Sequence, residues 1–190
     1  MFANLTYSVQ ICAMATTHYL DTIIQQTMTM LKKLGRPLLA VATIILCTIF
    51  GGSLFDLIVN EGNVTPQNYP DSVLLIRQYW ATKNPGNFFR PLTPFFTVLF
   101  IVLLVTYWTN KSTRTKLLFA FLFFFIVQII TFTYYFPQNE IIRTGNVDKL
   151  NSIKDAYFGT RFYLDIIRNL FSLIACIFMT AAAMDKNNCT

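Results

Sequence analysis

Apolar residues dominate four long stretches of the chain, and polar residues gather between them. A helix at the surface of a soluble protein needs one polar face, but residues 117–127, "LLFAFLFFFIV", contain no polar residue on any side. A membrane-spanning helix needs about 20 largely apolar residues. The pattern therefore predicts an all-α fold, an integral membrane four-helix bundle with spans at about 37–59, 93–109, 116–136 and 162–183.

Composition supports a membrane protein over a soluble helical bundle with a very apolar core. The 190 residues are 54% hydrophobic and 13% charged, whereas soluble domains contain about 25% charged residues. The chain has a mean hydropathy of +0.49 and a pI of about 9.2. Basic residues beside membrane spans account for that pI, so the predicted partner is the lipid bilayer and no nucleic-acid partner is expected.

The distribution of basic residues predicts how the chain crosses the membrane. Positive charge is densest just before the first span and in the short turn at 110–115, and cytoplasmic segments are enriched in Lys and Arg. These basic residues are Lys32, Lys33, Arg36, Lys111, Arg114 and Lys116. We expect a plasma (inner) membrane protein with both termini in the cytoplasm.

The first thirty residues do not fit the four-span pattern. Residues 1–30 contain no Lys or Arg and no long apolar run, so they resemble neither a signal peptide nor a span. We expect a poorly ordered leader. An over-extended start is an open alternative, because Met28 or Met30 would place basic residues directly before the first span, as is usual in membrane proteins.

Cysteine and histidine usage argues against several kinds of chemistry. The four cysteines are scattered without a C-x-x-C pair, and His18 is the one histidine. Zinc, haem and di-iron sites depend on clusters of these residues. We therefore predict no metal site and no cofactor, and expect the cysteines of the spans to be small buried residues.

Polar residues open the fourth span, which otherwise continues as an apolar helix. Asp165 lies three residues before Arg168 and four before Asn169, so the three share one helical face, and Arg161 extends that face by one turn. Ionisable residues within spans are costly and usually face the bundle interior or a cavity. This stripe is therefore expected to face the other helices.

Other polar residues are predicted to reach the same depth from different spans. Asp56 lies near the end of the first span and Asn139 just after the third, while Trp80 lies in the long outer loop 60–92. Two interpretations stay open: a site in a cavity near the outer face, or a structural ion pair that fixes helix register. For Trp80 the alternatives are a lid over the cavity or an interfacial aromatic belt.

Three segments resemble the anthrone oxygenase-like family of small four-span membrane proteins, most of them of unknown function. They are "GGSLFD" at 51–56, "YYFPQNEII" at 134–142 and "YFGTRFYLDIIRNLFSLIAC" at 157–176. Pro137, Asn139 and Arg168 stand at positions that match the family pattern, and the resemblance covers about residues 37–183. It implies a four-span bundle and, in oxygenase members, oxidation without a cofactor.

The chain departs from the family at one position. Many relatives carry a His three residues before the matching Arg, and Asp165 stands there in this chain. A neighbouring guanidinium favours the charged carboxylate and weakens it as a base. The resemblance therefore speaks more for the fold than for the activity.

Three classes of function remain. In the first, the protein binds or oxidises a small apolar or aromatic molecule in the outer half of the bundle. In the second, a non-catalytic accessory or scaffold protein uses its charges structurally. A transporter is the third, and it would require a homo-oligomer because no internal repeat is seen. For the first class, the candidate catalytic residues are Asp56, Asp165 and Arg168, and the candidate ligand-binding residues are Asn139, Asn169, Arg161 and Trp80.

Overall fold

The computed structural model describes residues 2–82 and 85–185, and every regular element in this part of the chain is a helix. The elements are α1 (Phe2–Phe55), η1 (Asp56–Glu61), α2 (Asp71–Thr82), α3 (Pro85–Thr106), α4 (Lys111–Ile130), η2 (Thr131–Tyr135), α5 (Phe136–Thr144), α6 (Val147–Ser152), α7 (Lys154–Ala156), η3 (Tyr157–Arg161) and α8 (Phe162–Ala183), where η marks a π-helical turn.

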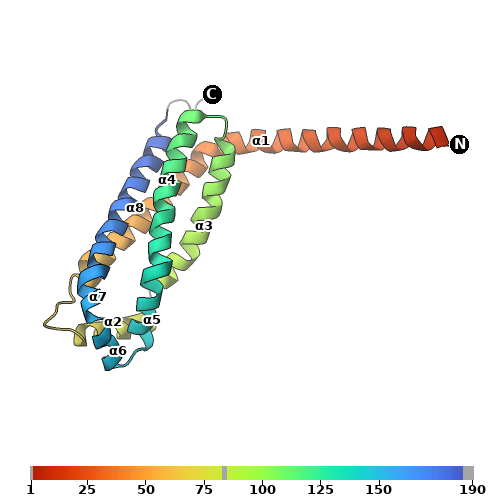
Figure 1. The fold of residues 1–190 in the computed structure, drawn as a ribbon. Helices are drawn as coiled ribbons and strands as arrows, with labels where there is room; N and C mark the ends of the chain where they lie inside the picture. Colours follow the sequence, from red (N-terminus) through yellow and green to blue (C-terminus); the bar gives the residue numbers. More distant parts are fainter. Residues whose placement is uncertain (1, 83–84, 186–190) are drawn as a thin grey trace.

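Four of these helical stretches are long and apolar enough to cross a bilayer. They are Lys33–Val59, Gly86–Thr106, Lys111–Thr144 and Lys154–Ala183. In Figure 1 α1, α3, α4 and α8 run along one bundle, in which α8 packs on α1 and α4, and α3 packs mainly on α1. The predicted all-α membrane four-helix bundle is confirmed, and the protein is embedded in a membrane.

Aromatic packing fills the centre of the bundle. Phe96 of α3 meets Phe124 of α4 edge to face with ring centroids 4.8 Å apart, and Phe100 stacks on Phe121 at 4.9 Å. Leu46, Phe96, Phe100, Leu103, Leu117 and Met179 are among the fully buried side chains. Because lipid is as apolar as these side chains, close packing rather than the hydrophobic effect holds such helices together.

The first helix extends well beyond the bundle. Residues 2–30, where a poorly ordered leader was expected, continue α1 as helix and project away from the bundle in Figure 1. No Gly or Pro occurs between residues 2 and 34 to interrupt the helix. Pro37 lies inside α1, and proline is a usual cause of helix bends.

The two ends of the bundle differ in character. The C-terminal end of α8, the turn between α3 and α4 and the start of the first span lie at the same end, which we call the C-terminal end (Figure 1). There the Asp185 carboxylate accepts bonds from Lys116 Nζ and Ser112 Oγ, both at 2.6 Å. The cytoplasmic location of this end remains a prediction.

The opposite end carries a small helical cap, formed by residues 62–82 and 136–156. Its apolar centre contains Val64, Tyr69, Val73, Ile142 and Leu150, together with Tyr157 from the start of η3. Arg77 of α2 donates to the carbonyls of Ile142 (2.7 Å) and Gly145 (2.6 Å), which satisfies the carboxyl end of α5. The predicted long outer loop 60–92 thus contains a helix that is bound to the end of the third span.

A tyrosine joins two parts of the cap. The Tyr69 hydroxyl donates to the carbonyl of Leu150. Burial raises the pKa of the Tyr69 phenol above its ordinary value, while the charge of Arg161 acts in the opposite direction. The phenol therefore stays protonated at neutral pH and keeps its role as a donor.

Candidate functional site

Three π-helical turns surround a polar cluster where the bundle meets the cap. Each turn ends on a residue of that cluster: η1 on Glu61, η2 on Tyr135 and η3 on Arg161. A π-turn adds a residue to the helical repeat, so it rotates the following side chains, and such turns are frequent at functional sites. Here they direct three polar side chains into the bundle instead of toward lipid.

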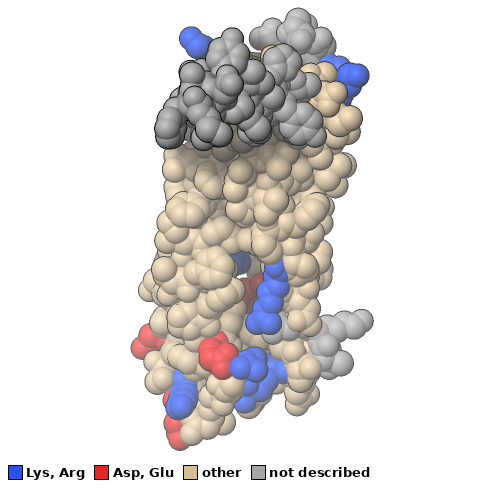
Figure 2. All heavy atoms as spheres, turned by 90° about the vertical axis from the view of Figure 1, so that its right-hand side faces the viewer, with Lys and Arg blue, Asp and Glu red and all other residues tan. Residues whose placement is uncertain are grey.

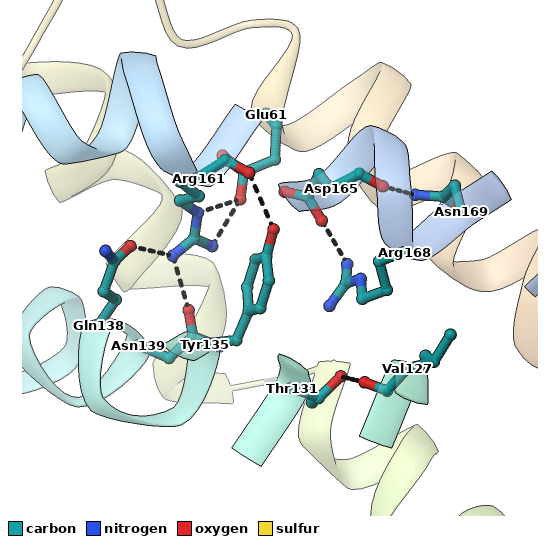
Figure 3. Close-up of polar contacts among 10 residues, drawn as sticks. All are labelled: Glu61, Val127, Thr131, Tyr135, Gln138, Asn139, Arg161, Asp165, Arg168 and Asn169. Carbon is teal, nitrogen blue, oxygen red and sulfur yellow. Dashed lines mark hydrogen bonds and ion pairs between the residues drawn. The ribbon is translucent and has the colours of Figure 1, made fainter. Parts of the chain in front are cut away.

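Arg161 is the centre of this cluster and is 3% exposed. Its Nη2 and Nε atoms donate to Oε1 of Glu61 at 2.6 and 3.1 Å, and its Nη1 lies 3.4 Å from Gln138 Oε1 and 3.2 Å from Asn139 Oδ1 (Figure 3). The guanidinium thus joins the ends of the first and third spans to the start of the fourth. A buried cation with this many partners has a structural role.

The Tyr135 ring lies between two guanidinium groups. The ring centroid is 5.0 Å from Cζ of Arg161 and 4.3 Å from Cζ of Arg168. The hydroxyl donates to the backbone carbonyl of Arg161 at 2.9 Å. Stacking on an aromatic face partly compensates a cation for lost water, so Tyr135 helps to hold both arginines inside the bundle.

Asp165 and Arg168 form the second ion pair, deeper in the bundle. Arg168 Nη2 lies 2.6 Å from Asp165 Oδ1, and the two side chains are 13% and 2% exposed. Asn169 Nδ2 donates to the backbone carbonyl of Asp165 at 2.9 Å. In Figure 3 the Arg168 side chain points away from α8, toward Tyr135 and Thr131.

Four buried polar side-chain atoms lack a hydrogen bond among the described residues, three on this stretch of α8 and one on α1. They are Ser53 Oγ, Asp165 Oδ1, Arg168 Nε and Asn169 Oδ1. Asp165 Oδ1 is nonetheless charge-paired, because Arg168 Nη2 lies 2.6 Å away; the atoms of this group that have no polar partner are Ser53 Oγ, Arg168 Nε and Asn169 Oδ1. Buried polar groups nearly always have a partner in protein, water or ligand, and in the bilayer an unsatisfied group costs several kcal/mol.

The bundle surface is hollowed on one face, in the half nearest the cap. Figure 2 shows the face on the α3 side, where basic and acidic atoms are visible at the bottom of a hollow in the half nearest the cap. The packing explains this opening, because α3 contacts α1 far more extensively than it contacts α4. Basic and acidic atoms are thus visible from this face of the bundle.

The structure brings most of the predicted site residues together. Arg161 and Asn139 are hydrogen-bonded, and Asp165, Arg168 and Asn169 follow on the same face of α8. Gathering these residues at one depth does not by itself show a function for them.

The other two predicted site residues are placed differently. Asp56 is half-buried at the start of η1, while the acid that pairs with Arg161 is Glu61, at the end of that turn. Trp80 packs against the apolar centre of the cap. It therefore contributes to the cap core and not to the charged cluster.

Glu61, Tyr135 and Gln138 belong to the cluster but were not among the predicted site residues. Glu61 lies beyond the predicted end of the first span. If this segment were a regular α-helix, the Glu61 side chain would point well away from that of Asp56, which lies five residues earlier. One turn of a π-helix contains closer to five residues, so the π-helical turn η1 brings the Glu61 side chain back to the inner face of the helix. Tyr135 lies in the motif "YYFPQNEII" at 134–142, but that motif was quoted for Pro137 and Asn139, and the tyrosine was not assigned a role.

Among the described residues, no three His, Cys, Asp or Glu side chains are arranged to hold a metal ion. Comparison of the chain with protein-family models, curated proteins and solved structures finds no match. The resemblance to the anthrone oxygenase-like family therefore remains a hypothesis that depends on the short motifs of the sequence.

Proposed function

We propose that this membrane protein binds a small, largely apolar or aromatic molecule in the half of the bundle nearest the cap, with Arg168 at the centre of the site. The observation that carries the proposal is the set of four buried polar atoms without hydrogen bonds, which lie on the facing helices α1 and α8. The hollow seen in Figure 2 lies in the same half of the bundle.

The unsatisfied atoms define what the ligand must offer. Arg168 Nε is a donor, Asp165 Oδ1 and Asn169 Oδ1 are acceptors, and the Ser53 hydroxyl can act as either. A molecule with a carbonyl or ether oxygen and a hydroxyl would satisfy these atoms. Aromatic and aliphatic side chains line the rest of the bundle interior, so the remainder of the ligand is apolar.

Oxidation is the activity that the family resemblance suggests for such a site. Converting an activated CH₂ group to a carbonyl consumes one O₂ and releases one water, so electrons and atoms balance without another reductant. Asp165 would accept the proton that leaves the carbon, and Arg168 would stabilise the resulting oxyanion. A purely structural ion pair is the competing account.

Ligand retention tests the proposal. The protein is extracted in mild detergent and denatured, and released small molecules are identified by mass spectrometry. We expect a specific apolar, oxygen-bearing compound with the wild type. Arg168→Met should retain at least about tenfold less, because one charge-assisted hydrogen bond contributes about 1.5–3 kcal/mol.

Arg143→Met is the matched control, because Arg143 forms an exposed pair with Glu140 outside the cluster. It should retain as much compound as the wild type. If no compound is recovered from the wild type, or if both folded variants retain it equally, the binding proposal is wrong and the structural account of the ion pair is favoured.

A further inference from the structure

A cavity lies beside the charged cluster, where the end of η1 meets the start of α8. It has a volume of about 290 Å³, which is large enough for a small organic group. Its lining residues are Glu61, Gly62, Val64, Tyr157, Phe158 and Phe162. This cap cavity is separate from the four unsatisfied atoms around Arg168, since none of their residues lines it.

The wall of the cap cavity combines one carboxylate with aromatic rings and contains no basic side chain. Glu61 lines it, whereas its partner Arg161 does not. Both bonds from Arg161 fall on the same oxygen, Oε1, and a carboxylate offers about four acceptor positions. The ion pair therefore fixes Glu61 in place and leaves Oε2 without a bond from Arg161.

The aromatic residues of the wall belong to a cluster in which two rings contact a cationic side chain. Tyr157 and Phe158 pack edge to face with centroids 5.4 Å apart, and Tyr69 lies 5.6 Å from Phe158. The Arg161 guanidinium lies 5.0 Å from the Tyr157 ring, and Lys154 Nζ lies 5.8 Å from the Tyr69 ring. Aromatic faces carry negative potential, which favours a cation beside them.

From this lining we infer that the cap cavity binds an organic ammonium group. A carboxylate with aromatic rings is the chemistry that recognises primary and quaternary ammonium ions. A bare metal ion would need several oxygen ligands, and Glu61 is the one charged residue in the wall. The ammonium group can come from a lipid headgroup or from a free amine, because the cavity lies at the edge of the membrane-spanning region.

Fluorescence of Trp80 provides the test, because Trp80 packs against the same apolar cluster as Tyr157. The full chain carrying Trp108→Phe, which leaves Trp80 as its one tryptophan, is placed in nanodiscs of phosphatidylglycerol, a lipid without an amine. Tetramethylammonium chloride is added, with sodium chloride at equal ionic strength as the reference. We expect a saturable change in Trp80 emission with tetramethylammonium alone.

Substitutions in the wall should weaken this response. Phe158→Leu and Phe162→Leu keep apolar volume but remove the ring, and each should raise the apparent Kd about fivefold to tenfold. Phe95→Leu, an exposed residue on α3, is the matched control and should not change it. Glu61→Gln should abolish the response, but this variant also affects Arg161, so the two phenylalanine variants are decisive if it does not fold.

Lipid composition separates the two sources of the ammonium group. If a lipid headgroup is the ligand, phosphatidylcholine in the nanodiscs raises the apparent Kd for tetramethylammonium, while glycerophosphocholine in solution does so much less. If a free amine is the ligand, soluble choline competes and the lipid does not. A response equal to that of sodium chloride, or a Kd unchanged in both phenylalanine variants, would overturn the inference.

Discussion

Replacing Arg161 with methionine is expected to lower the free energy of unfolding by about 3–5 kcal/mol, the usual cost of removing one partner from a buried ion pair. The substitution leaves the carboxylate of Glu61, 12% exposed, without its cation. It also removes the donors to Gln138 and Asn139. Thermal or denaturant-induced unfolding of the protein in detergent, followed by circular dichroism, measures this change.

Two comparisons show whether the loss of stability comes from the Glu61 carboxylate that is left without its cation. Arg143→Met removes an arginine from an exposed pair and should leave the unfolding transition unchanged. Arg161→Met combined with Glu61→Leu removes both charges and should recover most of the lost stability. A single Arg161→Met variant as stable as Arg143→Met would contradict the role of Arg161 as the centre of the cluster.

Asp165→Leu should be nearly as destabilising as Arg161→Met, with a loss of about 3–5 kcal/mol. It leaves the guanidinium of Arg168, whose side chain is 13% exposed, without a counter-ion in the bundle. The double variant Asp165→Leu with Arg168→Met replaces the pair by apolar residues of similar size and should be as stable as the wild type or more so. The same unfolding measurement applies.

The double variant also separates the two accounts of this ion pair. If the pair serves only helix packing, a stable double variant should behave as the wild type in every other assay. If the pair belongs to a binding site, the stable double variant should lose its bound compound. A double variant that is stable and still retains the compound would show that the ligand does not depend on these charges.

The spans could be predicted from the sequence because hydropathy and length are direct physical requirements of the bilayer. The cap could not. Residues 71–82 form α2, but their mixed polar and apolar sequence, "DSVLLIRQYWAT", reads as part of a long outer loop. Its position depends on contacts distant in sequence, such as the bonds from Arg77 to Ile142 and Gly145.

Five members of the charged cluster were predicted from the sequence, and Glu61, Tyr135 and Gln138 were not. Asp165, Arg168 and Asn169 share a face of α8 because they are three and four residues apart. Glu61 and Tyr135 end π-helical turns, whose altered repeat cannot be read from a pattern based on 3.6 residues per turn. Residues 2–30 are helical in the structure, whereas their sequence, without a long apolar run, provided no reason to extend the first span.

An experimental structure of the protein extracted with its native lipids would show directly whether the polar atoms around Arg168 hold a ligand. We expect density from a non-protein molecule within hydrogen-bond distance of Arg168 Nε, with its apolar part extending into the bundle. A structure in which protein side chains or ordered waters alone satisfy Ser53, Asp165, Arg168 and Asn169 would contradict this proposal.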